Sequence, residues 1–550
     1  MFNLSSLSER KLIFILCLVV FLVYFNSLFN GFVWDDFMQI INNDVVLNPK
    51  RIVELFKGGT FYSFGVLTSV YYKPLMSVSF MINYFLWGGE AFGFHLFQVV
   101  LHMTNVILVF LIFKNLFEKA VGNWAAFRLP KAEKKILPFL VALVWGIHPV
   151  NVESVAYIAG VQEVLYVFFS LFSLWLIMKG YSRAFLMAGI LIFLAFLAKE
   201  SALGGGLVIL FYLFIFEREK VVKWLIFFIL AMGLYFWLRL GVAKISIYNF
   251  LVGIPIMNAS FKERLLTIPL EVFHYLRMIF WPQVLAVDQN FVVKRISFFE
   301  FLLPFGVDFL FFGGLLILGL RKRSKLYCFF WVWFLGSIGL ILNIFPLDMT
   351  MSERWLYFPL IGFLGVLGLA ALEVLEIKKS LKKYSSLIVF LILVGLSLRT
   401  VVRNFDWKNN LTLFTHDIKY SRNSSHLETL LGVELLCRGK FDEGKKHMQR
   451  AIELQPKYWT NYMNMGTLFL TEGNFEAAEI NFQQAVENGL KYCKRDCPRV
   501  YEAVSGDLLS YGRYEKGWEF LEEGLLKYPD DDGLKKLKAQ YQFDEETVDF

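Results

Sequence analysis

The sequence predicts an all-α membrane protein, in which a bundle of about eleven transmembrane helices precedes a C-terminal α-solenoid of helical repeats. The first observation is composition: 57% of the 550 residues are hydrophobic and only 19% are charged, whereas soluble domains carry about 25% charged residues. The second is a series of membrane-length apolar runs that ends near residue 403. The third is the polar remainder, 404–550, which repeats itself with a fixed period.

The apolar runs mark twelve candidate spans, because a straight helix needs about 20 apolar residues to cross a bilayer. Basic clusters at 131–135, 321–325 and 378–383 are expected in the cytoplasm, where Lys and Arg gather. Twelve full crossings would place 321–325 outside. We therefore expect 265–281, which is interrupted by ionisable residues, to be re-entrant or interfacial. The candidates are 12–29, 93–116, 136–149, 161–178, 184–198, 202–216, 221–239, 265–281, 300–320, 326–345, 357–375 and 386–402.

The first span fixes the sidedness of the chain. It follows Arg10 and Lys11, so residues 30–92 are predicted to form a first loop outside the cytoplasm. Eleven spans place everything after residue 403 on that same side. Within the first loop, the apolar and aromatic stretch 75–87 is expected to be a helix lying in the membrane interface. The net charge of +8 fits basic cytoplasmic loops and gives no reason to expect nucleic-acid binding.

The C-terminal part has a 34-residue period. Gly432 and Gly466, Phe441 and Phe475, and Ala451 and Ala485 are each 34 residues apart. A third copy follows an insertion of five residues, with an aromatic residue again at the position of the two phenylalanines. Small residues where two helices cross, at this period, are typical of tetratricopeptide repeats. We assign three repeats, near 426–458, 459–493 and 498–531, in a domain spanning 404–550 after a membrane domain spanning 1–403.

Two adjacent carboxylates, Asp35 and Asp36, follow the first span directly. Carboxylates at a membrane boundary are costly unless they pair, bind a cation or take part in chemistry. One of them could serve as a general base toward an acceptor hydroxyl, and the pair also suits a divalent metal ion. The structural alternative is a helix cap or a solvated turn.

Other polar residues lie at predicted outer ends of spans. His148 and Glu153 flank Pro149, which breaks a helix, and either bind an acceptor or cap the span. Arg354 offers a planar fork that suits a phosphate, or it pairs with the adjacent Glu353 at a helix start. Lys199 could contact a lipid phosphate, or it pairs with Glu200 in a loop. The remaining candidates are Arg277 for a phosphate and Tyr357 for a pocket.

Several chemistries have no support in the sequence. There is no P-loop, dinucleotide fingerprint, nucleophile elbow or HExxH motif. No cofactor is therefore required by the pattern, apart from the divalent metal that the acidic pair would suit. The five cysteines form no metal pattern, and Cys493 and Cys497 either form a local disulfide or are free thiols.

The order of the short motifs carries a family resemblance. The motifs are Trp34-Asp35-Asp36, 42–45, Tyr72-Lys73-Pro74-Leu75, 93–96, His148-Pro149-Val150 through Glu153, Lys199-Glu200, Ser352-Glu353-Arg354-Trp355-Leu356-Tyr357 and 404–407, followed by the repeats. In this order the chain resembles the transmembrane and tetratricopeptide-repeat-containing O-mannosyltransferases and their bacterial relatives, which are GT-C glycosyltransferases. The resemblance covers nearly the whole chain.

The resemblance implies a GT-C-like membrane domain that transfers a sugar from a polyprenyl-phosphate carrier, with inversion, at the extracytoplasmic face. It implies that Asp35 or Asp36, with Asp35 favoured, is the base. Arg354 and Lys199 would stabilise the leaving phosphate. The pocket and acceptor side would be lined by His148, Glu153, Glu200, Glu353 and Tyr357. The family default is mannose on a protein, but eukaryotic members carry more repeats, so a protein or a glycan acceptor stays open.

Three alternatives remain. A polymerase or transferase acting on a lipid-linked or surface glycan would use the same residues. A membrane-anchored scaffold would use only the repeats, but an anchor needs one span. A transporter would place charges in mid-span, whereas the charged candidates here lie at span ends. Few repeats and a compact chain indicate a bacterial inner membrane, with the repeats in the periplasm; in an endoplasmic reticulum the same face would be lumenal.

Overall fold

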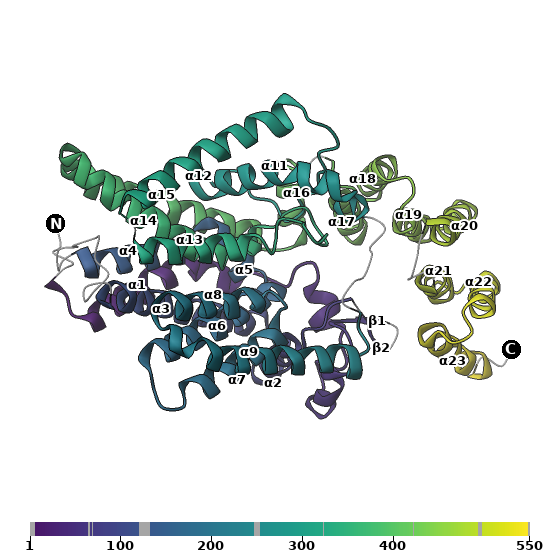
Figure 1. Cartoon of the computed structure of the whole chain (residues 1–550). Coiled ribbons are helices and arrows are strands. Elements are labelled where there is room, and N and C mark those ends of the chain that lie inside the picture. Colours follow the sequence, from purple (N-terminus) through teal and green to yellow (C-terminus); the bar gives the residue numbers. More distant parts are fainter. Residues whose placement is uncertain are drawn as a thin grey trace.

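The computed structural model describes residues 6–63, 66–68, 70–119, 133–246, 254–322, 324–421, 423–492 and 498–547. Most of this part is helical (Figure 1). The described strands are β1 (Phe61–Ser63) and β2 (Val66–Thr68), which pair antiparallel in the first loop. Cys493 and Cys497 lie outside the described residues.

Seven helical segments in the described part of the chain are long and apolar enough to cross a membrane. A further pair, Lys135–Gly146 and Pro149–Ala156, is bent by 50° and is either a broken span or a re-entrant loop. The helical polytopic class is therefore confirmed, while the count of eleven spans stays a prediction. The seven segments are Glu9–Phe29, Ala91–Glu118, Ile158–Lys179, Arg218–Val242, Phe298–Gly319, Pro359–Ile377 and Lys379–Asp406.

The helices of the membrane domain differ in length. Shorter apolar helices are α2, α7, α8 and α13, and α11 is not among the candidate spans. The bounds are α1 (Glu9–Tyr24), α2 (Pro74–Trp87), α3 (Ala91–Lys119), α4 (Glu133–Gly146), α5 (Val152–Ala156), α6 (Val161–Lys179), α7 (Ala184–Ala198), α8 (Ala202–Phe216), α9 (Val221–Phe236), α10 (Pro255–Asn258), α11 (Phe261–Phe280), α12 (Leu303–Lys322), α13 (Lys325–Ile338), α14 (Pro359–Ile377) and α15 (Lys382–Asp406).

Close packing holds the bundle together around α3 and α6. The helix α3 packs against α1, α4 and α6, and α13 packs against α14. Gly362 shows how tight the last contact is, because a Cβ there would lie 2.7 Å from the backbone nitrogen of Phe334. By contrast, only 6% of the apolar window that includes α15 is buried, so this helix turns its apolar side chains outward, as contact with lipid requires.

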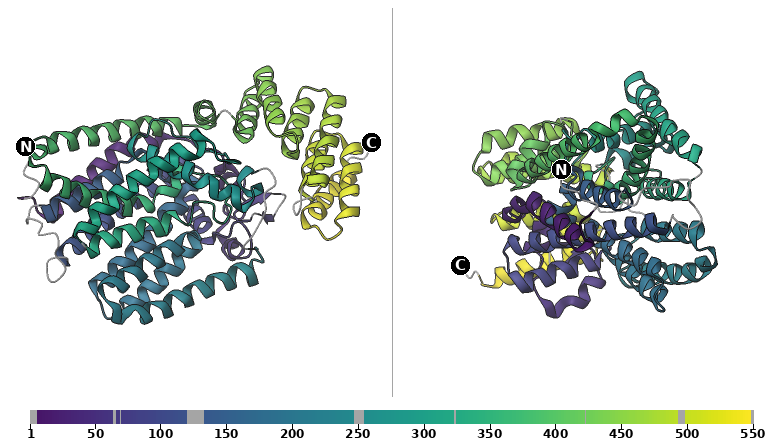
Figure 2. Two further views of the ribbon diagram at one scale, coloured as in Figure 1. Left: turned by 45° about the horizontal axis from the view of Figure 1, so that its top comes forward. Right: turned by 90° about the vertical axis from the view of Figure 1, so that its left-hand side faces the viewer.

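The two ends of the bundle are different. The N-terminus lies at one end, and the β1–β2 hairpin and the C-terminal helices lie at the other (Figures 1 and 2). The loop that carries Asp35 and Asp36 is therefore at the same end of the bundle as the C-terminal domain.

The C-terminal helices form three packed pairs. Each pair turns at a glycine in the left-handed region, at Gly439 (φ +73°), Gly473 (φ +76°) and Gly512 (φ +73°), where a residue without Cβ is favoured. The bounds are α16 (Asn410–Asp417), α17 (Ser425–Cys437), α18 (Phe441–Leu454), α19 (Trp459–Thr471), α20 (Phe475–Tyr492), α21 (Pro498–Ser510), α22 (Tyr514–Lys527) and α23 (Asp532–Thr547).

The first repeat helix shares the core of the membrane domain. Leu427, Leu431 and Leu435 of α17 belong to the same buried cluster as the membrane helices. Residues of α20, α21 and α22, such as Phe482 and Leu508, form a separate core. The start of the C-terminal domain is therefore built into the membrane domain, and the later repeats pack among themselves.

Candidate active site

Asp36 is an internal anchor of the first loop. Its side chain is fully buried. One carboxylate oxygen accepts the backbone N–H of Val33 at 2.9 Å, and the other accepts that of Ala159 at 2.8 Å. Burial raises the pKa of Asp36 well above its usual value, against the effect of these two hydrogen bonds. Both oxygens are thus occupied in joining the first loop to the turn before α6.

Trp34 gives the loop its shape. Its backbone has φ +54°, which is uncommon for a bulky residue and is held only where the surroundings enforce it. Asn410 of α16 accepts the Trp34 backbone N–H at 2.8 Å. The indole stacks on Tyr157 with ring centroids 5.7 Å apart, and Tyr157 stacks in turn on Trp407 at 5.1 Å. These contacts turn the chain so that consecutive residues, Asp35 and Asp36, have different surroundings.

Asp35 is the available carboxylate of the pair. In the part of the chain that the structure describes, neither of its oxygens accepts a backbone N–H. Burial raises its pKa, and the Tyr157 hydroxyl and the charges of Arg354, His426 and Lys73 partly offset this effect. A half-buried carboxylate with a raised pKa is a stronger base than an exposed one, as a group that takes a proton requires.

Arg354 is held in place by Glu153. It lies in η10 (Glu353–Leu356), and its Nη1 donates to Glu153 at 2.7 Å while its backbone N–H donates at 3.0 Å. The Ser352 hydroxyl donates to the same carboxylate. The buried Nε of Arg354 has no hydrogen-bond partner among the described residues. The Nη1 of the guanidinium is therefore fixed by the protein, while the Nε retains an unused donor.

Lys73 is a second cation near Asp35. Its Nζ lies 4.2 Å from the centre of the Tyr71 ring, and the Tyr71 hydroxyl donates to Asp348 at 2.5 Å. Burial lowers the pKa of Lys73 to about 8, with Lys199 and Arg354 adding to the effect of burial and Glu200 and Asp348 opposing it. Among the described residues, Lys73 forms no ion pair, so its charge is available to an anionic ligand.

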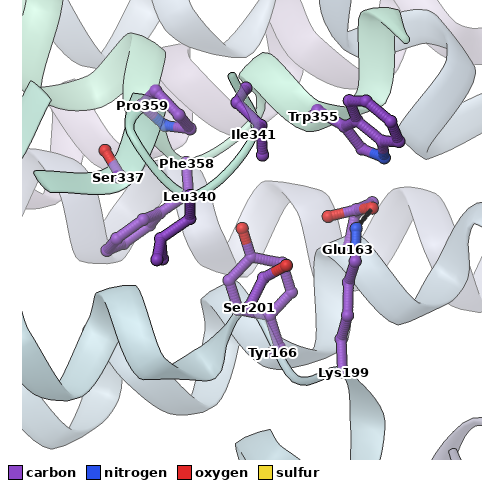
Figure 3. Close-up of a pocket in the computed structure, with 10 residues that line it drawn as sticks. All are labelled: Glu163, Tyr166, Lys199, Ser201, Ser337, Leu340, Ile341, Trp355, Phe358 and Pro359. Atoms are coloured by element: carbon purple, nitrogen blue, oxygen red, sulfur yellow. Dashed lines mark hydrogen bonds and ion pairs between the residues drawn. The ribbon is translucent and has the colours of Figure 1, made fainter. Parts of the chain in front are cut away.

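A pocket with a polar end and apolar walls lies between α6, α8 and the segment that contains η10 (Figure 3). The cavity itself is small, about 10 Å³, which is close to the room that one water molecule needs. Lys199 forms an ion pair with the fully buried Glu163 at the polar end, near Ser201. The apolar wall consists of Tyr166, Leu340, Ile341, Trp355, Phe358 and Pro359.

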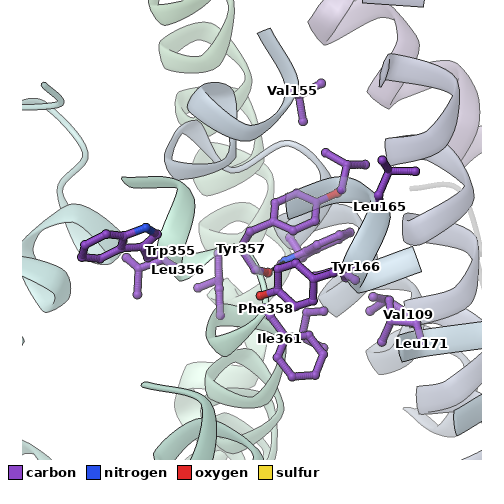
Figure 4. Packing of buried hydrophobic residues seen from close by; sticks show 14 of the residues in the cluster. Val109, Val155, Leu165, Tyr166, Leu171, Trp355, Leu356, Tyr357, Phe358 and Ile361 are labelled. Carbon is purple, nitrogen blue, oxygen red and sulfur yellow. Dashed lines mark hydrogen bonds between the residues drawn. The ribbon is translucent and has the colours of Figure 1, made fainter. Parts of the chain in front are cut away.

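The structure places the other predicted residues in bonded networks. Glu200 pairs with Arg239 at 2.6 Å. His148 accepts the backbone N–H of Val150 through Nδ1 and contacts the Ile279 carbonyl through Nε2, so it caps a helix start. Tyr357 contacts His102 at 2.7 Å and lies within the buried hydrophobic cluster of Figure 4.

Glu353 and Arg277 are not joined to Asp35. Glu353 accepts from Arg403 at 3.1 Å, and burial raises its pKa to about 8. Arg277 lies on α11, and within the described residues it makes no hydrogen bond or ion pair with Asp35, Arg354 or Lys199. The structure therefore groups Asp35 with Arg354 and Glu153, and it leaves Arg277 apart.

The metal role predicted for the acidic pair stays a prediction. Each oxygen of Asp36 accepts one backbone N–H, which leaves it fewer lone pairs for a metal ion. No group of three or more His, Cys, Asp or Glu suited to a metal occurs in the described ranges.

Sequence reasoning missed three groups beside Asp35: Lys73, Tyr157 and His426. Lys73 lies in one of the short motifs, but a single lysine before a helix gives no sign of its burial. Tyr157 and His426 come from segments more than 100 residues away from Asp35, and no local pattern marks them.

The relatives compared below all carry the name protein O-mannosyl-transferase. No protein-family model matches it. It is 24% identical over 543 residues to protein O-mannosyl-transferase TMTC3 of Mus musculus, covering 87% of this chain and 56% of the relative. It is 24% identical over 583 residues to Tmtc3 of Drosophila melanogaster, covering 89% and 61%. Human protein O-mannosyl-transferase TMTC4 is 33% identical over 172 residues, covering 30% and 22%.

The chain spans 56% to 63% of the length of the first four such relatives, and between 82% and 89% of this chain is matched. The resemblance that the motifs indicate is thus confirmed: relatives named protein O-mannosyl-transferase match most of this chain at 24% to 25% identity.

Proposed function

We propose that the protein is a membrane glycosyltransferase that moves a sugar from a polyprenyl-phosphate carrier to a hydroxyl of a protein acceptor at the extracytoplasmic face. The names of the relatives support sugar transfer to a protein, with mannose as the expected sugar. The observation that carries the proposal is the placement of Asp35, whose carboxylate accepts no backbone N–H from the described residues, beside the cations Arg354 and Lys73.

In the proposed reaction, the oxygen of the acceptor hydroxyl attacks the anomeric carbon of the donor sugar, and Asp35 takes the proton of that hydroxyl. The bond between that carbon and the phosphate oxygen breaks, and the bonding electrons leave with the phosphate. Attack from the side opposite the phosphate inverts the configuration. Arg354 and Lys73 supply positive charge where negative charge develops, and such electrostatic stabilisation is usually the largest contribution to catalysis.

The pocket of Figure 3 is too small to hold the lipid part of the donor as it stands. Its polar end nevertheless carries a cation, and Lys199 would contact the donor phosphate from there.

The C-terminal helix pairs fit tetratricopeptide repeats, whose concave surface would present an acceptor protein. They lie at the same end of the bundle as the loop of Asp35 (Figure 1). Positive-inside counting puts this end outside the cytoplasm; in a bacterium this is the periplasmic side of the inner membrane.

The test is a transfer assay with purified protein in lipid nanodiscs. Radiolabelled polyprenyl-phosphate mannose, polyprenyl-phosphate glucose and the matching nucleotide sugars are supplied with protein and glycolipid fractions of the host. Label that enters protein from a lipid-phosphate donor, and not from a nucleotide sugar, is the expected result. Label in glycolipid alone contradicts the protein acceptor, and no transfer from any donor contradicts the glycosyltransferase.

A further inference from the structure

The first repeat helix, α17, is fixed to the membrane domain at its N-terminus. Its N-cap, Ser424, accepts the backbone N–H of Leu427 at 3.0 Å and donates its own hydroxyl to the buried Asp288. Asp288 follows α11 in an outer loop, and the neighbouring Val287 donates its backbone N–H to Asp417 of α16 at 2.8 Å. The beginning of α17 therefore has a defined position relative to the site.

His426 stands in the first turn of α17 and faces the site. Its ring centroid lies 5.7 Å from that of Trp34, the residue that turns the chain before Asp35. Its Nδ1 is 3.6 Å from Asp288. The His426 side chain is 45% exposed, while that of Asp288 is 1% exposed. One side of the imidazole is thus turned to the acidic groups, and the other remains accessible.

The charges around this point come from several elements. Asp35 is faced by Lys73 before α2, Tyr157 before η6 (Ile158–Gly160), Arg354 of η10 and His426 of α17. His426 itself is faced by Asp288 and Asp35: burial lowers its pKa, and the two carboxylates more than offset this, so that the pKa is raised. Three further titratable groups lie near Asp35 or its partners: Asp36, Tyr71 and Asp348.

We propose that His426 is a positioning residue that the C-terminal domain supplies to the active site, so that the site is built jointly from both domains. Its imidazolium favours the ionised form of Asp35. The catalytic part of this proposal rests on the proposed function. The placement stands on the contacts with Trp34 and Asp288 and on the shared core of α17.

The physical need for such a group follows from burial. Low-dielectric surroundings favour the neutral carboxylic acid, whereas a general base must be ionised. The His426 imidazolium counteracts this effect and comes from a different element than Arg354 and Lys73, the proposed partners of the donor phosphate.

The placement is tested by NMR titration of the full-length protein with ¹³C-labelled histidine, in detergent micelles. The histidine signal that is absent from His426→Gln is assigned to His426. Asp35→Asn is expected to lower the pKa of His426 by roughly half a unit to one unit, because a nearby negative charge is removed. The matched control, Asp44→Asn, removes an exposed carboxylate of the same loop and should change nothing. An unchanged His426 titration in Asp35→Asn overturns the placement.

The role is tested by the pH profile of sugar transfer. His426→Gln should move the acid limb of kcat/KM to higher pH, because the Asp35 carboxylate then loses a neighbouring cation. At a fixed pH on that limb, kcat/KM should fall about tenfold for every pH unit by which the limb moves. His426→Lys, which keeps a positive charge, should restore much of the loss. The control is His447→Gln, since His447 lies in the same domain and pairs with Glu428 at 2.6 Å.

The outcomes separate the two proposals. If the enzyme is active and the pH profiles of kcat/KM are the same for His426→Gln and His447→Gln, the positioning role is wrong and the proposed function stands. If the wild-type protein transfers no sugar, the proposed function is wrong, and the NMR titration still decides the placement of His426.

Discussion

At the residue scale, the two cations beside Asp35 are held differently. Arg354 is tied to Glu153 by its side chain and its backbone. Lys73 rests on the Tyr71 ring and has no ion-pair partner in the described part of the chain. A fixed guanidinium can define the position of a phosphate, while a compact ammonium on a flexible stem can follow it.

Lys73 gives a pH-dependent prediction. Because its pKa is about 8, the positive charge is present below that pH and is lost as the pH rises through it. We therefore expect kcat/KM for the donor to fall above about pH 8. In Lys73→Arg the guanidinium stays charged, so the basic limb should move to higher pH. Identical basic limbs in the two proteins would contradict a role for Lys73.

Thermal unfolding provides an independent readout for the same residue. The folded-state pKa of about 8 is below the ordinary value of 10.5, so burying the ammonium costs free energy that is fully present below pH 8. This cost shrinks as the pH approaches 10.5. Lys73→Met should therefore raise the Tm at pH 7 and raise it less at pH 10.

The sequence identifies the acidic pair but not the role of each member. Adjacency to the first span and to Trp34 is visible in the chain. The difference between Asp35 and Asp36 depends on the backbone N–H of Ala159, which is 123 residues away, and on the left-handed Trp34. Neither follows from local pattern. Lys73 and His426 were missed for the same reason.

At the element scale, the short segment from α5 to η6 carries much of the site. Glu153 holds Arg354, Tyr157 stacks on Trp34, and Ala159 binds Asp36. The segment follows a bend of 50° after α4, where Pro149 prevents the helix from continuing. The bend exposes backbone N–H groups that a straight helix would have used internally.

Gly160 is the tightest point of this segment. A Cβ there would lie 2.6 Å from the Glu153 carbonyl oxygen, and backbone cannot move aside without displacing η6. Gly160→Ala should lower stability by about 1–3 kcal/mol, as overpacking does, and should reduce transfer by moving Ala159 away from Asp36. Gly233→Ala on α9, where a Cβ meets nothing within 4 Å, is the control, and Tm and activity are the measurements. Equal Tm values and equal activities in Gly160→Ala and Gly233→Ala would contradict this prediction.

The existence of the membrane-domain helices was predictable from the apolar runs, but the residues at which some of them end were not. The candidate 326–345 ends as a helix at Ile338, because the following residues, with Asn343 at φ +50°, form an irregular loop. Asn343 contacts Glu271 and the Thr350 carbonyl. This loop uses tertiary hydrogen bonds that hydropathy does not reveal.

At the scale of the whole molecule, a buried ionic network joins the last span to the C-terminal domain. Arg403 of α15 donates to Asp417 of α16 at 2.7 and 3.2 Å and to Glu353 at 3.1 Å. Glu353 neighbours Arg354, so the network links domain docking to the site. The membrane class and the 34-residue period were readable from the sequence; this docking was not, because it depends on contacts between distant segments.

The Asp417 carboxylate leads to a prediction of how the contact between the membrane domain and the C-terminal domain responds to mutation and to low pH. Asp417→Asn leaves the Arg403 charge buried with fewer partners, which costs about 3–5 kcal/mol. Burial opposes ionisation of Asp417, but Arg403 and His416 lower its pKa below the usual value. Its stabilisation is therefore present above about pH 4 and is lost as the pH falls through the lowered pKa.

Limited proteolysis after α15 measures this docking. Asp417→Asn should be cleaved between α15 and α17 at neutral pH, and the wild-type protein should become sensitive only in acid. Asp442→Asn, an exposed acidic residue of α18, is the control. Resistance of Asp417→Asn equal to that of Asp442→Asn would show that the network does not hold the domains together.

The most direct test of the central assignment compares Asp35→Asn with Asp36→Asn. If Asp35 is the base, Asp35→Asn should keep the wild-type Tm and lose at least about 100-fold in kcat. Asp36→Asn should lower the Tm, because an amide N–H₂ would face a backbone N–H that needs an acceptor. Transfer per folded molecule and Tm are measured on the same samples. An Asp35→Asn protein that keeps wild-type transfer would contradict the assignment.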